Sequence, residues 1–170
     1  TAATLIRGLT NAGFKVGAAK VTGTGSGRDT WLMTDAGSKL TLDFTHAGYP
    51  STYLATPEQI DGIIETLVAH LSVAKVDAIV IEVADGLLQC ETAALLDSMG
   101  AAAGVECLQR KNLPIAAVSG RLTASPLAII ETGKITGMPV LDKAALSSQT
   151  IAEVLQISPQ MSGMRNAAAR

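Results

Sequence analysis

The sequence is poor in aromatic residues and has no excess of basic charge. Aromatic residues make up 3% of its 170 residues, and the formal net charge at pH 7 is −2. Nucleic-acid-binding proteins usually carry a basic patch or stripe, and no such stripe is visible here, so we expect no nucleic acid among the partners. No apolar run reaches about 18 residues, the length of a membrane-spanning helix, so we expect no contact with a membrane.

Cysteine is equally scarce. Cys90 and Cys107 form neither a CxxC pair nor a cluster with histidine. Isolated cysteines of this kind are typical of thiols that stay reduced in the cytosol, and no signal peptide is visible. We therefore expect a cytoplasmic protein in which both cysteines are ordinary helix residues.

Small and apolar residues are abundant instead. Hydrophobic residues make up 48% of the chain, which also contains 16 glycines. Chains with many small residues often pack helices closely onto a parallel sheet, and this length suits one domain with a sizeable core. We predict a single α/β domain over residues 1–157 and an irregular tail over residues 158–170.

Hydrophobic periodicity predicts an alternation of helices and strands. Helical spacing is clear over residues 1–12 and 56–74, and Thr56, Pro57 and Gln59 form the pattern of a capped helix start. Further helices are predicted over 90–112, 125–133 and 143–156, and strands over 14–21, 39–44, 76–86, 113–120 and 138–142. This alternation favours a three-layer α/β fold, in which a parallel sheet with right-handed crossovers carries helices on both faces.

Ligands of parallel α/β sheets bind at the carboxyl ends of the strands, where Glu82 ends the most hydrophobic run. A carboxylate there can hold Mg²⁺ directly or through water, as the strand-end acid of nucleotide-hydrolysing proteins does. It can also cap the next helix or pair with a lysine. Because a charge at the end of so apolar a strand needs a partner, we favour the metal, and we predict ligand contacts from Asp85 and Gly86 just beyond it.

A glycine-rich loop, TGTGSGRD (22–29), follows the strand that contains Lys20. Glycines let backbone N–H groups turn inward around an anion, and Lys20 would direct its ammonium at the same phosphate or carboxylate. The further anion contacts that we predict are Thr22, Gly23, Thr24, Gly25 and Arg28. Asp29 would help to hold a metal. The alternative is a flexible loop with solvated charges; the dinucleotide-binding fingerprint does not apply, because we expect no helix directly after the loop.

Two other strand ends carry candidates. Asp43 and His46 can form an acid–base pair, although a histidine in such a setting is more often structural. Ser119 and Arg121 follow the predicted strand 113–120, and we predict that both contact the ligand.

With these residues in place, the chain resembles the P-loop nucleoside triphosphatases, in particular the group with dethiobiotin synthetase and the molybdopterin-guanine dinucleotide accessory proteins. TAATLIRGLTNAG resembles the helix after their Walker A loop, KVGAAKVTGTG the synthetase's strand-lysine-loop pattern, and IVIEVADGLL its strand ending in Glu-Gly-x-Gly-Gly. The chain is also similar to bacterial P-loop proteins of uncharacterised function, which share the threonine/glycine loop, an Asp-Phe segment like Asp43-Phe44 and a strand end like Glu82.

The resemblance implies Mg²⁺ and ATP or GTP as cofactors, with Glu82 and Lys20 as catalytic residues and Glu82 and Asp29 toward the metal. No Walker A motif, GxxxxGK[ST], occurs in the sequence. We therefore expect the first strand and the phosphate loop to precede Thr1, which would lie near the Ser/Thr that binds Mg²⁺. Because Val-Ala-Asp-Gly follows Glu82 where the synthetase has Gly-x-Gly-Gly, its carboxylation chemistry is not carried over.

Three functions follow from these observations. The first is a Mg²⁺-dependent ATP- or GTP-binding enzyme that hydrolyses the triphosphate or uses it to activate a small anionic substrate. The second is a non-catalytic, nucleotide-dependent switch that presents residues 22–48 to a partner, with Asp43, Tyr49 and Tyr53 as contacts. The third is an α/β domain that binds a small anion without any triphosphate. Related folds commonly form homodimers, and the sequence leaves the oligomeric state open.

Overall fold

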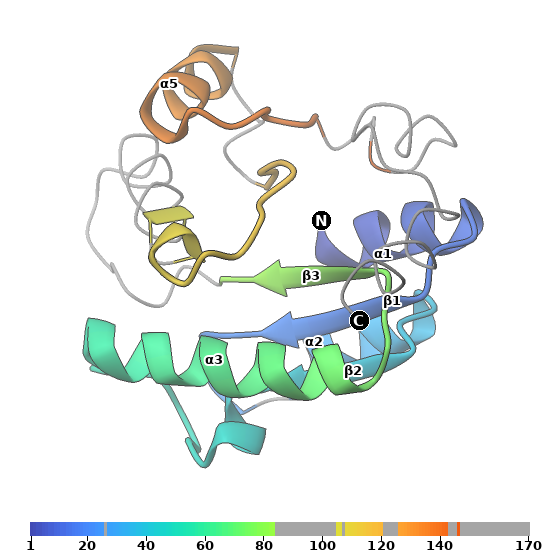
Figure 1. The fold of residues 1–170 in the computed structure, drawn as a ribbon, viewed down its shortest axis with the longest axis vertical. Helices are drawn as coiled ribbons and strands as arrows, with labels where there is room; N and C mark the ends of the chain where they lie inside the picture. Colours follow the sequence, from blue (N-terminus) through green and yellow to red (C-terminus); the bar gives the residue numbers. More distant parts are fainter. Residues whose placement is uncertain (26, 84–104, 107, 121–125, 143–145, 147–170) are drawn as a thin grey trace, which may run out of the picture.

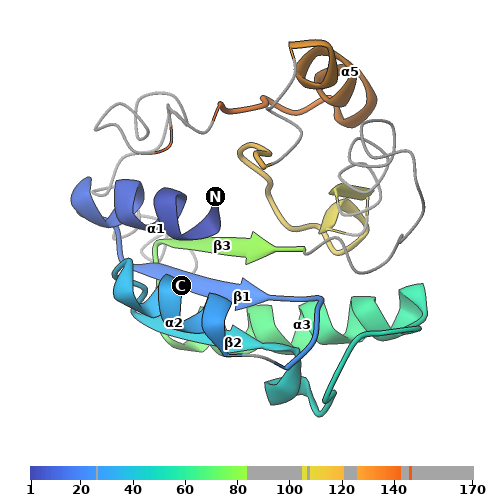
Figure 2. The ribbon, with the colours of Figure 1, turned by 180° about the vertical axis from the view of Figure 1, so that it is seen from behind.

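A computed structural model describes residues 1–25, 27–83, 105–106, 108–120, 126–142 and 146. Three parallel strands form its sheet in the order β2-β1-β3, with β1 at Val16–Lys20, β2 at Leu40–Asp43 and β3 at Ala78–Glu82. Figures 1 and 2 show the sheet, and in Figure 2 all three strands are seen side by side and point the same way. The prediction of a parallel α/β sheet is confirmed for this part of the chain.

Helices cover both faces of the sheet (Figures 1 and 2). Helices α1 (Ala2–Asn11) and α2 (Arg28–Asp35) contribute to one hydrophobic core, and α3 (Pro57–Val73) contributes to the other. Successive side chains of a strand point to opposite faces, so Val16 and Ala18 of β1 join the core with α1 and α2, while Ala19 joins the core with α3. The predicted three-layer arrangement is thereby confirmed.

Helix α3 forms as its sequence predicts. The Thr56 hydroxyl accepts a hydrogen bond from Gln59 N–H at 3.4 Å, and Gln59 Oε1 accepts one from Thr56 N–H at 2.8 Å, which completes the capping box. Its buried face consists of Ile60, Ile63, Ile64, Leu67 and Leu71. Burial of each such side chain contributes about 1.5–3 kcal/mol, so α3 is packed firmly against its face of the sheet.

Helix α2 corrects one expectation. We expected no helix directly after the glycine-rich loop, yet α2 begins at Arg28, with Gly27 at its N-cap. The sequence hides this helix because α2 has no apolar stripe. Only Met33 is buried, while Trp31 and Leu32 are exposed. Polar contacts at both ends of α2, rather than an apolar stripe, attach it to the rest of the protein.

The later part of the chain is less regular. The strands predicted over 113–120 and 138–142 are wrong in extent, because one parallel bridge between Val118 and Val140 is all the pairing that the described residues show there. The predicted short helix is α5 (Pro126–Thr136), which extends three residues further than 125–133.

Other predictions for this half cannot be compared. The described residues within 90–112 are 105–106 and 108–112, and those at 105–106 and 108–110 are helical. The predicted helix 143–156 and the tail 158–170 lie outside the described residues, apart from Leu146, and so do Cys90 and Cys107. Within the described ranges, no helix is both long enough and apolar enough to cross a bilayer.

Candidate functional site

The carboxyl ends of the three strands bring one basic and two acidic residues into a row. Lys20 at the end of β1 is in register with Asp43 of β2 on one side and with Glu82 of β3 on the other. Adjacent strands lie about 4.8 Å apart, and register partners in a parallel sheet point to the same face. Lys20 shares its face with Val16 and Ala18, so the row faces α1 and α2. We call Asp43, Lys20 and Glu82 the strand-end row.

Lys20 is buried and already has a carboxylate partner. The residue is 5% exposed, and its ammonium forms an ion pair with Asp29 in the first turn of α2. Gly23 closes over the lysine stem: its φ is +139°, and a Cβ there would lie 2.9 Å from Lys20 Cε. This backbone conformation favours glycine, and a Cβ there would also require the lysine stem to move. The loop after β1 therefore folds back over the residue that ends the strand.

Glu82 has one oxygen that is buried without a partner. Among the described residues, no donor hydrogen-bonds to Glu82 Oε2. A buried carboxylate oxygen that lacks a hydrogen bond is costly, because it loses water without replacement. Oε2 thus makes no lysine pair within the part of the chain that is described, and the start of the next predicted helix, which Glu82 could cap, lies outside that part. Its environment suits a proton donor, a water molecule or a cation.

The glycine-rich loop is anchored to the segment that follows β2. Gly23 N–H donates to Thr52 Oγ1 at 2.8 Å, Thr52 N–H donates to Gly23 O at 3.1 Å, and Thr24 forms an antiparallel bridge with Ser51. A Cβ on Gly25 would lie 3.2 Å from Pro50 O, so the two segments are in close contact there as well. These bonds contradict a freely flexible loop. They also engage the Gly23 N–H, so Gly23 contacts an anion only if the bond to Thr52 opens.

The remaining predicted site residues have mixed positions. Thr22 is fully buried, and Thr24, Gly25 and Arg28 are exposed. Thr1 is exposed at the N-cap of α1 and makes no capping bond through its side chain. The Ser119 hydroxyl donates to Leu141 O at 2.8 Å, so it holds residues 119 and 141 together. Asp85, Gly86 and Arg121 lie outside the described residues.

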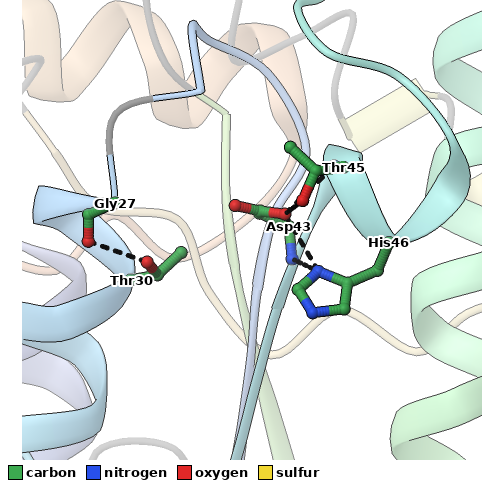
Figure 3. A network of polar contacts seen from close by, with 5 residues as sticks. All are labelled: Gly27, Thr30, Asp43, Thr45 and His46. Carbon is green, nitrogen blue, oxygen red and sulfur yellow. Dashed lines mark hydrogen bonds and ion pairs between the residues drawn. The ribbon is translucent and has the colours of Figure 1, made fainter.

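Asp43 and His46 do come together, but as a cap (Figure 3). Asp43 Oδ1 accepts a hydrogen bond from Thr45 N–H at 3.0 Å and lies 2.9 Å from His46 Nδ1, and the two residues form a capping box on the 3-10 helix η1 (Phe44–Ala47). Nδ1 lies 3.1 Å from Asp43 N: a neutral Nδ1 accepts that N–H, whereas a protonated one donates to the carboxylate. Burial raises the pKa of Asp43, but hydrogen bonds from Thr45 and His46 outweigh it and hold the pKa below its ordinary value. The capping role therefore accounts for the contact between Asp43 and His46 without a catalytic role.

The place of Asp43 in the strand-end row was not predicted. Both neighbours of β1 follow it in the chain, so sequence order alone shows neither that β1 lies between β2 and β3 nor that Asp43, Lys20 and Glu82 stand at one level. The signal was present in part, because all three residues end predicted strands. In Figure 3 the second carboxylate oxygen of Asp43 points away from His46.

The same close-up shows how α2 begins. The Thr30 hydroxyl donates to Gly27 O at 2.8 Å, and a Cβ on Gly27 would lie 3.0 Å from the Trp31 ring. At the other end of the helix, Arg7 Nη2 donates to Asp35 O at 2.9 Å, and the Thr34 and Thr41 hydroxyls lie 3.1 Å apart. Helix α2 is therefore tied to α1 and β2 at its C-terminal end and to Lys20 at its N-terminal end.

The residues that are described fit Mg²⁺ through Glu82. Within the described ranges, no group of three His, Cys, Asp or Glu side chains is arranged to hold a metal ion. Mg²⁺ does not need such a group, since it commonly binds one or two carboxylates together with water and substrate phosphates. The unpartnered Glu82 Oε2 suits that role. Asp29, the second predicted metal ligand, is the ion-pair partner of Lys20.

Fold and site together define an α/β protein whose three-stranded parallel sheet carries charged side chains at its carboxyl edge. Comparisons of the chain with protein-family models, with curated proteins and with solved structures find no match.

Proposed function

We propose that the protein binds Mg²⁺ with ATP or GTP at the carboxyl edge of the sheet, and hydrolyses the triphosphate or uses it to activate a small anionic substrate. The observation that carries this proposal is Glu82 Oε2, a buried carboxylate oxygen without a hydrogen bond in the described residues, one strand away from the buried ammonium of Lys20. Such a pair offers one position for a cation and one for an anion. The resemblance of α1 and β1 to P-loop proteins supports the choice of a nucleotide.

The charges around Lys20 favour a cation together with the anion. Asp43 and Glu82 flank Lys20 in the strand-end row, and Asp29 pairs with it. Acidic residues thus outnumber the one ammonium at this edge of the sheet: Asp29 pairs with it, and Asp43 and Glu82 end the neighbouring strands. A bare phosphate would meet net repulsion there, whereas a phosphate that arrives with a divalent cation would not. This balance supports a magnesium nucleotide over the alternative of a small anion bound alone.

Each residue then has a defined task. Glu82 would hold the metal directly or through water, and the bound Mg²⁺ would neutralise charge on the phosphate oxygens. Lys20 would bind the anionic substrate or the terminal phosphate. Helix α1 begins on the side toward which the strands point (Figure 1), and the partial positive charge of a helix N-terminus favours phosphate there. Catalysis would then come from positioning and charge stabilisation.

Replacement of Glu82 tests the proposal. Glu82→Gln keeps the shape of the side chain but removes its charge, so we expect Mg²⁺-dependent nucleotide turnover to fall by roughly 10-fold to 100-fold. The matched control is Glu58→Gln, because Glu58 is exposed in the first turn of α3. Turnover of ATP and GTP is measured against Mg²⁺ concentration on the natural full-length protein. Unchanged turnover and Mg²⁺ dependence in Glu82→Gln would contradict the role of Glu82.

A nucleotide-dependent switch is the second candidate, and exposed apolar side chains favour it. Trp31, Tyr53 and Leu54 are 70%, 73% and 80% exposed, and they lie on segments that the bridge between Thr24 and Ser51 joins. Asp43 fits this role less well, because its carboxylate caps η1. A change in Trp31 fluorescence on addition of Mg²⁺ and nucleotide, without measurable turnover, would favour the switch over the enzyme.

A further inference from the structure

The ion pair between Lys20 and Asp29 joins two very different environments. Lys20 is buried at the end of the central strand, whereas the Asp29 side chain is 43% exposed at the start of a short helix. A buried ammonium needs a negative partner, because it has lost most of its hydration. Asp29 supplies that partner from within the chain.

Of the two partners, Asp29 is the one that can move away. Lys20 is the last residue of β1, which pairs with β2 on one side and with β3 on the other, and Gly23 lies over its side-chain stem. Asp29 belongs to the first turn of α2, and the contacts that tie α2 to the rest of the protein through Asp35 and Thr34 lie at the opposite end of the helix. The first turn can therefore shift while the last turn stays attached.

We propose that Asp29 is an internal competitor for the anion that Lys20 binds, an inference that rests on the anion-binding role given to Lys20 above. Without ligand, the Asp29 carboxylate neutralises the buried ammonium. A phosphate or carboxylate group of the ligand takes its place, and Asp29 turns toward water. The observed association constant for the anion is then the intrinsic constant multiplied by the fraction of molecules in which Lys20 is not paired with Asp29.

A natural reporter lies next to this pair. Trp31 is the single tryptophan of the chain, and its ring lies against the backbone of Gly27, two residues before Asp29. If the first turn of α2 shifts when Asp29 leaves Lys20, the surroundings of the Trp31 ring change with it. Trp31 fluorescence therefore follows the exchange without a label.

The experiment titrates inorganic phosphate into the wild-type protein and three variants, by calorimetry and by Trp31 fluorescence. Asp29→Asn removes the competing charge and keeps a hydrogen-bond acceptor, so we expect roughly tenfold tighter phosphate binding, which corresponds to about 1.4 kcal/mol of removed competition. Asp35→Asn is the matched control on the same helix, and its affinity should equal that of the wild type. Lys20→Met should abolish binding.

The outcomes separate this inference from the proposed function. Phosphate affinity in folded Asp29→Asn that is equal to or weaker than wild type overturns the inference, and so does the absence of binding in every protein. If Asp29→Asn does not fold, the carboxyl carbon signal of Asp29 in the wild type decides by NMR: it must shift along the same isotherm as the Lys20 ammonium, and an unmoved signal overturns the inference. Absence of Mg²⁺-dependent nucleotide turnover in the wild type refutes the nucleotide enzyme, and a Glu82→Gln variant with normal turnover refutes the metal role of Glu82. Neither result affects the phosphate titrations.

Discussion

Strand β3 and the segment 113–118 are both short apolar runs, yet they pair very differently. All five residues of β3, AIVIE, are in register with β1, whereas LPIAAV forms a single bridge through Val118. Composition separates the two runs only at Pro114, which has no N–H to donate to a neighbouring strand. The difference lies in the neighbour, because an extended apolar run becomes a strand only where another strand offers its N–H and C=O groups.

Helices α3 and α5 show the same contrast between the two halves. Both begin at a proline, but α3 buries five large aliphatic side chains, whereas α5 buries Ala128, Thr132 and Thr136. Three of the four large aliphatic side chains of α5, Leu127, Ile130 and Ile135, are exposed, and the fourth, Ile129, is half-buried. The first half of the molecule therefore supplies most of both hydrophobic cores, and α5 contributes little to either core within the described residues.

The largest expected effect tests this contrast directly. Leu67 of α3 is fully buried, so Leu67→Ala should lower the free energy of unfolding by about 2–5 kcal/mol. Ile130→Ala on α5 removes an exposed side chain and should change it by less than about 0.5 kcal/mol. Urea denaturation followed by circular dichroism measures both. Similar losses in the two variants would mean that α5 is as well packed as α3.

A pair of glycines sharpens the comparison at the site. Gly23→Ala forces a Cβ into an unfavourable φ and against Lys20, so we expect a loss of roughly 1–3 kcal/mol in the free energy of unfolding. Gly62 in α3 has open space around it, so Gly62→Ala should instead stabilise by about 0.5–1 kcal/mol. Thermal and chemical denaturation measure the sign of the change in the free energy of unfolding for each variant. A neutral Gly23→Ala would show that the loop after β1 is less closely fitted than described.

The smallest expected effect is the loss of stability that Asp43 causes at acidic pH. The pKa of Asp43 in the folded protein lies below its ordinary value of 3.8, so its contribution to stability is fully present above that value and is lost as the pH falls through the lower, folded pKa. The stability difference between wild type and Asp43→Asn should therefore shrink as the pH falls below about 3.8. Thr45→Val, which removes one donor to Asp43, should show a weaker form of the same change. A difference that is constant from pH 7 to pH 2.5 would exclude this linkage.

Local patterns predicted what local forces determine. Helix α3 follows from the Thr56 capping box and an apolar stripe, and β1 and β3 follow from continuous apolar runs. Helix α2 was missed because its packing rests on few buried side chains and on contacts distant in sequence, such as Arg7 with Asp35.

The site was predictable to the same degree. Lys20 and Glu82 were recognisable as charged residues at the ends of apolar strands, which is a local feature. Their alignment with Asp43 depends on strand order and register, and both are set by contacts between segments far apart in the sequence. The pairing of Lys20 with Asp29 depends on where α2 begins, so it could not be predicted once that helix was missed.

The central position of β1 has a consequence for how the protein tolerates change. Ala18 and Ala19 are neighbours in sequence, but each lines a different hydrophobic core. A larger side chain at one of them crowds a single layer, and the sheet stands between that layer and the other. The two cores can therefore diverge independently in related sequences, with compensating substitutions confined to one side of the sheet.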